Sequence, residues 1–467
     1  MVVGSGPNGL AAAIALAQTG RRVRVYEAAP EIGGSARTAA LTEPGFLHDV
    51  CSAVFPLAVA SPFFETLPLA QYGLDWVHSP ALVAHPFDDG SAVVLERSVE
   101  ATARELGPDG PAYEHLLGAF VREWDRLKTT VLAPLDVFAH PWTLLRFGRF
   151  ALRSAQGLAL SVFRGERARA LFAGLAAHSA LPLDRPVSAG YGLVLAIAGH
   201  AGGWPIAKGG SRALPLALVS HLESLGGDVI AGQPVQTLEE LPRAPVVLCD
   251  TSPRGLVRIA GHRLPSRYRR RLSAFRYGPA AYKLDYALSA PVPWKAGACR
   301  RAATVHLGGT FAAIAASERE PIRGRCAERP FVLLVQPSVF DASRAPPGKH
   351  TVWAYCHVPN GSATPMWERI EQQIERFAPG FRDCIIARSI KPPAALEGWN
   401  PNLVGGDING GLQGLSQVWA RPTRSTYRTP ARGLYLCSSS TPPGGGVHGM
   451  CGYFAARRAI QEIAPPA

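Results

Sequence analysis

The sequence predicts an α/β fold in which glycine-rich segments from the two ends of the chain come together. Two observations predict this: a glycine-rich β-α-β pattern opens the chain, and a strand, glycine loop and helix close it. The composition agrees, because 47% hydrophobic and 18% charged residues are typical of a folded globular protein. At about 100–200 residues per domain, 467 residues suggest two or three structural units.

The first β-α-β unit occupies the N-terminal segment. A short apolar strand precedes a G-x-G-x-x-G pattern, a helix is expected over 10–19, and the alternating residues 22–26 predict a second strand. The glycines permit a tight turn, a close approach of the backbone to a pyrophosphate, and close packing of helix on strand. The free N–H groups at the helix N-terminus favour phosphate. The predicted nucleotide-binding residues of this turn are Gly4, Gly6, Pro7, Asn8 and Gly9.

An acidic residue ends the second strand. Glu27 follows Gly9 by 18 residues (27 − 9), where a carboxylate accepts bonds from ribose hydroxyls and disfavours a 2′-phosphate. The site therefore suits FAD or NAD better than NADP. The opening strand is short for a Rossmann-like unit, so either the true start lies upstream or the edge of this strand is truncated.

A second glycine pair favours FAD over NAD as the bound cofactor. Gly33 and Gly34 precede Arg37 and Thr38, and this stretch resembles the G-G-x-x-R-[ST] fingerprint of the GR2-type flavoproteins. The resemblance implies that Gly33, Gly34 and Arg37 lie along the diphosphate and ribityl chain of FAD. Because no second G-x-G-x-x-G pattern follows, we expect no separate NAD(P)H domain.

The closing pattern spans 433–463. An apolar strand over 434–437 leads into a loop of small residues and a helix expected from Val447 onward. Small residues let the backbone pass close to a flat ring, and the helix dipole would stabilise negative charge there. An ordinary glycine-rich loop is the alternative. The residues predicted to contact the cofactor here are Ser438, Pro443, Gly445, Gly446 and Val447.

His448, in the same loop, is the candidate catalytic residue. An imidazole beside the ring would relay a proton or stabilise the flavin N1, and the alternative is a histidine that bonds a loop carbonyl. On the catalytic hypothesis, His448→Ala keeps FAD bound and slows turnover, whereas unchanged turnover would remove the role.

Together the two ends resemble the phytoene-desaturase-like FAD-dependent oxidoreductases. This group includes carotenoid desaturases, retinol saturases and the pyridine nucleotide-disulphide oxidoreductase domain-containing proteins, and the last branch is nearest. The resemblance rests on motifs spread along the chain: Pro44–Phe46, His48–Asp49, Cys51–Ala53, Gly405–Ile408, Arg421–Pro422, Tyr427–Pro430 and Pro443–Gly449. It is loose over about 100–200 and 290–400. It implies FAD as cofactor and backbone contact of Val235 with the adenine.

The resemblance also implies a discontinuous layout. A GR2-type Rossmann-like FAD-binding domain would take 1–75, 204–260 and 404–467, and a mixed-sheet substrate domain 76–100 and 261–403. A helical insert, with a membrane-facing surface as a hypothesis, would take 101–203. Strands of the substrate domain are expected at 305–307, 331–335 and 351–357.

These features predict an FAD-dependent oxidoreductase that adds or removes hydrogen across a carbon–carbon bond of an apolar, isoprenoid-like substrate. A flavin amine oxidase and a non-catalytic FAD-retaining binding protein stay open as alternatives. No metal-ligand cluster is present in the sequence, so no metal is expected. The eight cysteines form no Cys-x-x-Cys pair, which argues against a disulfide reductase.

The net charge of the chain and one arginine-rich segment indicate where in the cell the protein could act. The chain carries 48 Lys+Arg against 35 Asp+Glu, and Trp142–Phe172 mixes aromatic, leucine and arginine residues as interfacial segments do. The alternatives are codon bias and a helical domain with solvated arginines. We find no nucleic-acid module, no apolar run of spanning length and no secretory signal. We therefore expect a cytoplasmic protein, with peripheral membrane contact as a hypothesis and the oligomeric state open.

Overall fold

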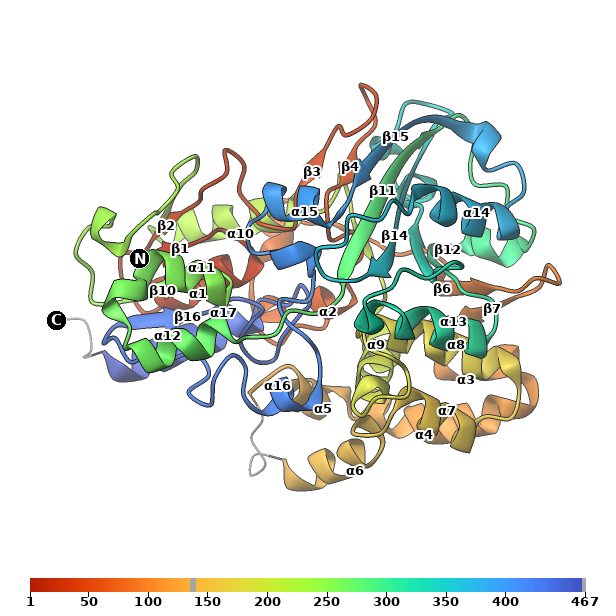
Figure 1. Ribbon diagram of the computed structural model, residues 1–467, viewed down its shortest axis with the longest axis horizontal. Coiled ribbons are helices and arrows are strands. Elements are labelled where there is room, and N and C mark those ends of the chain that lie inside the picture. Colours follow the sequence, from red (N-terminus) through yellow and green to blue (C-terminus); the bar gives the residue numbers. More distant parts are fainter. Residues whose placement is uncertain (135–139, 464–467) are drawn as a thin grey trace.

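A five-stranded parallel sheet joins the two ends of the chain. The computed structural model describes residues 1–134 and 140–463, so the last four residues of the predicted FAD-binding domain lie outside the described part. The strand order is β16-β10-β1-β2-β9, and every neighbouring pair is parallel. The strands are β1 (Val2–Val3), β2 (Arg24–Tyr26), β9 (Asp228–Ile230), β10 (Val247–Cys249) and β16 (Leu434–Leu436). The predicted α/β fold class is confirmed (Figure 1).

Helices cover both faces of this sheet, because successive strand residues point to opposite sides. Val2, Val25 and Leu248 join the core of one face, and their neighbours Val3 and Cys249 join the core of the other. The first face packs against α1 (Pro7–Ala17), α10 (Ala213–Ser224) and α17 (Met450–Glu462), and the second against α11 (Pro253–Ala260) and α12 (Ser266–Ser273).

The terminal helices α1 and α17 approach each other closely. A Cβ on Gly452 of α17 would lie 1.7 Å from the Asn8 carbonyl oxygen of α1, so only glycine permits this contact. Helix α17 begins at Met450 and not at Val447 as the sequence suggested. The reason is that Gly449 has φ +69°, a left-handed conformation that a helix cannot continue through.

A seven-stranded mixed sheet forms the second layer. Its order is β15-β11-β14-β13-β12-β6-β7, with only the β12–β6 pair parallel. On one face, α14 (Trp367–Phe377) covers the side chains of the central strands, and the helical insert approaches the other. The strands are β6 (Ala81–Pro86), β7 (Ala92–Leu95), β11 (Ala280–Leu288), β12 (Ala302–Leu307), β13 (Val332–Val335), β14 (His350–Val358) and β15 (Ile385–Lys391).

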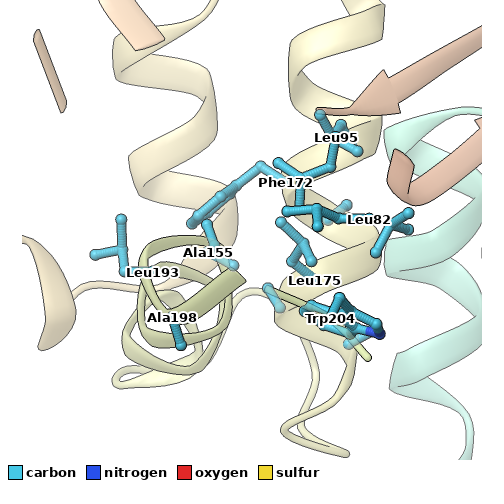
Figure 2. Packing of buried hydrophobic residues seen from close by; sticks show 14 of the residues in the cluster. Leu82, Leu95, Ala155, Phe172, Leu175, Leu193, Ala198 and Trp204 are labelled. Carbon is cyan, nitrogen blue, oxygen red and sulfur yellow. The ribbon is translucent and has the colours of Figure 1, made fainter. Parts of the chain in front are cut away.

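The helices between β7 and β8 form a bundle beside the mixed sheet (Figure 1). Leu82 and Leu95 of the sheet pack with Phe172 and Leu193 of the bundle, close to Trp204 (Figure 2). The bundle consists of α3 (Val99–Glu105), α4 (Gly110–Arg122), α5 (Trp124–Val131), α6 (Pro141–Ala151), α7 (Ala155–Val162), α8 (Glu166–Ala177) and α9 (Ser188–Gly202). None of the helices in the described ranges combines the length and apolarity needed to cross a bilayer.

Short elements connect these layers. Two small antiparallel ribbons pair β3 (Thr38–Ala39) with β4 (His48–Asp49), and β5 (Trp76–Val77) with β8 (Ile206–Ala207). The remaining helices are α2 (Pro56–Val59), α13 (Phe311–Arg319), α15 (Pro393–Trp399) and α16 (Leu415–Trp419).

Candidate active site

A cavity of about 540 Å³ lies where the two sheets meet. Its walls come from the N-terminal glycine loop, the segment 51–57, the C-terminal loop and the strands β13 and β14. Predicted site residues from both ends of the chain therefore line one space. Those lining it are Gly4, Gly6, Pro7, Asn8, Glu27, Gly34, Arg37, Val235, Ser438, Gly446 and Val447.

The glycine loop is too tightly packed for any other residue. A Cβ on Gly9 would lie 2.1 Å from the Gly4 carbonyl oxygen, and one on Gly34 would lie 2.9 Å from the Gly6 Cα. Gly9 and Gly33 are not among the lining residues. They act behind the wall, since Gly9 fixes the turn and the Gly33 N–H donates to Ser5 Oγ at 3.0 Å.

Glu27 is held by the loop it faces. Its Oε2 accepts from the backbone N–H of Ser5 at 2.9 Å and from the Ser5 hydroxyl at 2.6 Å, and its Oε1 accepts from the Ala29 N–H at 2.9 Å. These bonds fix the carboxylate at the end of β2, on the cavity wall.

Arg37 also lines the cavity. Its guanidinium stacks on the Trp399 ring at 3.7 Å, and its Nε donates to the Gly34 carbonyl oxygen at 2.8 Å. Burial lowers the pKa of Arg37, but an arginine keeps its charge at neutral pH. The wall therefore presents a fixed cation near the glycine pair.

Asp250 is a site residue to which sequence reasoning assigned no role. Its Oδ2 accepts from the Gly9 N–H at 3.0 Å, and burial raises the pKa of Asp250 to about 7. The signal was present in the sequence, because Asp250 directly follows a buried strand, and the carboxyl ends of parallel strands meet at one edge.

Some residues of the C-terminal loop line the cavity, and others pack behind its wall. Pro443, Gly445 and His448 are not among the lining residues, and a Cβ on Gly445 would lie 2.9 Å from the Asn409 carbonyl oxygen. The buried His448 accepts from the Met450 N–H through Nδ1 at 3.0 Å, and burial lowers the pKa of His448 to about 4. This bond is to a backbone N–H, whereas the alternative expected a bond to a loop carbonyl, and both the alternative and the catalytic role stay predictions.

The nucleotide end of the cavity fits a dinucleotide such as FAD. The N-terminus of α1 supplies N–H groups, Glu27 an acceptor for a ribose, and Val235 an apolar wall. The buried Oδ1 of Asn8 has no hydrogen-bond partner, which leaves one polar atom of this turn available to a ligand.

The other end of the cavity is apolar and aromatic. Trp353 and Tyr355 of β14 alternate with residues of the opposite face, so both rings point to the cavity side, 5.1 Å apart in an edge-to-face pair. Trp204 also lines this end and donates from Nε1 to Thr304 Oγ1 at 3.0 Å. The acidic lining residues, Glu27 and Asp250, both lie at the nucleotide end.

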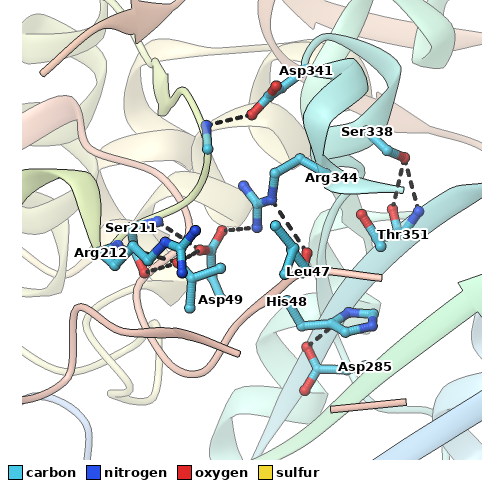
Figure 3. A network of polar contacts seen from close by, with 12 residues as sticks. Leu47, His48, Asp49, Ser211, Arg212, Asp285, Ser338, Asp341, Arg344 and Thr351 are labelled. Atoms are coloured by element: carbon cyan, nitrogen blue, oxygen red, sulfur yellow. Dashed lines mark hydrogen bonds and ion pairs between the residues drawn. The ribbon is translucent and has the colours of Figure 1, made fainter. Parts of the chain in front are cut away.

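Behind the wall, a buried polar network links the ribbon β3–β4 to strand β11 of the mixed sheet and to the loops beside it (Figure 3). Asp49 accepts from Arg344 at 2.7 Å and from the Ser211 N–H at 2.7 Å. His48 lies 3.8 Å from a carboxylate oxygen of Asp285, which also pairs with Lys283. His48 and Asp49 therefore hold the ribbon β3–β4 in place and do not line the cavity.

Comparisons with known proteins agree with this architecture. Residues 2–67 match the NAD(P)-binding Rossmann-like domain family. The chain is 26% identical to pyridine nucleotide-disulfide oxidoreductase domain-containing protein 2 of Mus musculus, over 99% of this chain and 93% of that protein. It is 27% identical to a phytoene dehydrogenase of Streptomyces griseus, over 83% and 77% of the two chains.

Solved structures share the fold at low identity. An oxidoreductase from Methanosarcina mazei has a TM-score of 0.68 at 16% identity, covering 98% of this chain and 99% of that one. Putrescine oxidase bound to putrescine has a TM-score of 0.62 at 17% identity, covering 99% and 98%. The resemblance to phytoene dehydrogenase and to the pyridine nucleotide-disulfide oxidoreductase domain-containing proteins is confirmed, and the residues at the nucleotide end of the cavity fit the expected FAD.

Proposed function

For an FAD-dependent oxidoreductase with this cavity, we propose that the reaction adds or removes hydrogen across a carbon–carbon bond of an apolar, isoprenoid-like molecule. One observation carries the proposal: beyond the nucleotide end, most of the described lining side chains are aromatic or aliphatic, the polar ones such as His178 and Thr304 are uncharged, and none is a carboxylate. Such a wall favours a ligand without charge, since an ion would lose its hydration there without gaining a counter-ion.

The chain's own residues would bind and orient the substrate. Each methylene group transferred from water to this wall contributes roughly 0.8 kcal/mol, so a long hydrocarbon chain gains affinity from contact alone. The rings of Trp204, Trp353 and Tyr355 give the space a defined shape and exclude water. FAD, when bound, supplies the acceptor or donor of the hydride, and solvent or a weak base takes or returns the proton.

The phytoene dehydrogenase relative supports a polyene or isoprenoid substrate. The alternative is amine oxidation, which the likeness to putrescine oxidase and to the cyclohexylamine oxidase of Brevibacterium oxydans favours, together with the aromatic wall. The missing carboxylate weighs against that alternative for a cationic amine. A binding protein that retains FAD without turnover is the third candidate.

Anaerobic reduction of the bound flavin separates these candidates. We expect isoprenoid lipids, including those that mass spectrometry finds co-purifying with the protein, to bleach the flavin or to reoxidise its reduced form. Putrescine and cyclohexylamine should leave the spectrum unchanged. Bleaching by the amines would favour the amine oxidase. Bleaching by dithionite alone would favour the binding protein.

We further propose that α6 and α7 rest on an anionic membrane surface. Trp142 and Leu145 are 77% and 65% exposed, and Arg149 lies on the same helix. Apolar side chains beside arginines suit the lipid headgroup boundary, from which an apolar substrate would be drawn. The charge-introducing pair Trp142→Glu and Leu145→Glu should abolish sedimentation with anionic liposomes at low salt.

The matched control makes the same kind of change at another exposed apolar site. Ile386 and Ile390 of β15 are 45% and 39% exposed, and their replacement by Glu should leave liposome binding unchanged. Equal binding of wild type and the α6 variant, or no binding by wild type, would contradict the membrane proposal.

A further inference from the structure

Two histidines lie together at the apolar end of the cavity. His178 follows the last residue of α8 and lines the cavity, and His306 of β12 lies fully buried behind it. Their Nε2 atoms are 3.1 Å apart. At that distance one ring donates an N–H and the other accepts it, so the pair shares one hydrogen bond.

Burial keeps both rings neutral. It lowers the pKa of His178 to about 3 and that of His306 well below its ordinary value. Each imidazole therefore carries one proton, on either Nδ1 or Nε2. The direction of the hydrogen bond between the two rings therefore decides which nitrogen of His178 carries the proton of that ring.

The surroundings of His306 set that direction. Its Nδ1 is buried without a hydrogen-bond partner, and a Cβ on Gly174 would lie 2.6 Å from it, so the backbone of α8 closes this side. A proton on that atom would be a buried unpaired N–H, which costs about 1–3 kcal/mol. With the proton on His306 Nε2, Nδ1 is an unpaired acceptor that faces the Cα–H side of Gly174, and a lone pair tolerates that contact better than an N–H does. His306 then donates to His178, and His178 carries its own proton on Nδ1.

The Nδ1 of His178 has no partner among the described residues. The ring of His178 packs against the edge of Trp204, 5.8 Å between centroids, and the space it borders is the cavity. The nearby hydroxyl of Thr304 already accepts from Trp204. This part of the apolar wall thus offers a neutral N–H donor to a ligand.

We propose that His178 recognises an uncharged oxygen, such as a carbonyl or hydroxyl, on an otherwise apolar substrate. The inference rests on the proposed function and narrows its substrate class. A pure hydrocarbon would leave the His178 N–H donor unpaired. An ammonium group would bring a second donor to it, which disfavours a protonated amine.

The test compares two ligands with one carbon skeleton, a polyene aldehyde and the corresponding polyene hydrocarbon. Binding to the FAD-loaded protein is followed by quenching of tryptophan fluorescence, since Trp204 and Trp353 line the cavity. Wild type should bind the aldehyde roughly fivefold to tenfold more tightly than the hydrocarbon. His178→Leu should lose that preference while still binding the hydrocarbon.

Two further variants separate recognition from a folding defect. His178→Asn places an amide N–H near the position of Nδ1 and should keep part of the preference. His115→Leu makes the same change as the test variant at an exposed position of α4 and should keep all of it. Each variant is checked for wild-type FAD content before the titration.

Equal affinity of wild type for both ligands, or a preference that persists in His178→Leu, would overturn the role of His178. Binding of neither ligand would refute the apolar-substrate proposal, and this inference with it. If both ligands bind and neither alters the redox state of the flavin, the proposed reaction fails, whereas the binding preference still decides the role of His178.

Discussion

Replacing Gly9 by alanine should remove FAD from a protein that still folds. The new Cβ would lie 2.1 Å from the Gly4 carbonyl oxygen and 3.1 Å from Asp250 Oδ2. The first neighbour is backbone and cannot rotate away, so the turn between β1 and α1 must open. Opening threatens the Gly9 N–H bond to Asp250 and the Gly4 N–H bond to the Tyr26 carbonyl oxygen, at 3.0 and 2.8 Å.

The expected magnitude follows from those losses. Each hydrogen bond contributes about 1 kcal/mol, and a buried partner left unpaired costs about 1–3 kcal/mol more, so the turn loses roughly 3–5 kcal/mol. If this cost falls on the bound state, FAD affinity drops by roughly 10²–10⁴-fold. Titration of the FAD-free protein with FAD, followed by flavin fluorescence, measures the change.

A glycine elsewhere provides the control. A Cβ on Gly148, inside α6, meets nothing within 4 Å, so Gly148→Ala should bind FAD like wild type. Wild-type affinity in Gly9→Ala would refute the reasoning that this turn cradles the cofactor.

Three further variants test the surrounding structure. Burial raises the pKa of Asp250 from 3.8 to about 7, so the folded chain binds its proton more tightly and stability falls as pH rises from about 4 to about 7. Asp250→Asn should flatten this fall in urea unfolding, and an unchanged slope would contradict it. Arg344→Met leaves the buried Asp49 carboxylate unpaired and should lower the free energy of unfolding by about 3–5 kcal/mol, partly recovered by adding Asp49→Asn; a loss under about 1 kcal/mol would contradict this. Trp399→Leu removes the ring stacked on Arg37 and should weaken FAD binding roughly threefold to tenfold, and unchanged FAD affinity would contradict it.

The nucleotide half of the site could be predicted from short sequence patterns. The spacing of Gly4, Gly6 and Gly9 and the strand ending at Glu27 are short-range signals, and the structure places Gly4, Gly6 and Glu27 on the cavity wall. The role of Asp250 in the site could not be predicted in this way, because its contact to Gly9 joins residues that are 241 apart in the chain. Such a contact depends on strand order, which a β-α-β motif alone does not specify.

The apolar half depended on tertiary packing. The strand expected at 351–357 exists as part of β14, but its alternation does not reveal which face meets the cavity. The pairing of His178 with His306 joins the end of a helix to a strand 128 residues later, without any shared motif. His448 shows that local pattern can also suggest a position that the packing does not give. Its place in the glycine loop suggested a ring on the cavity wall, but the ring lies behind that wall and bonds the Met450 N–H.

The flavin content of the purified wild-type protein tests the central claim most directly, namely that the two terminal loops enclose one FAD. The visible spectrum, followed by chromatography of the nucleotide released on denaturation, should show FAD at about one equivalent per chain. A colourless protein that takes up no added FAD, despite the cavity between the loops, would contradict the claim.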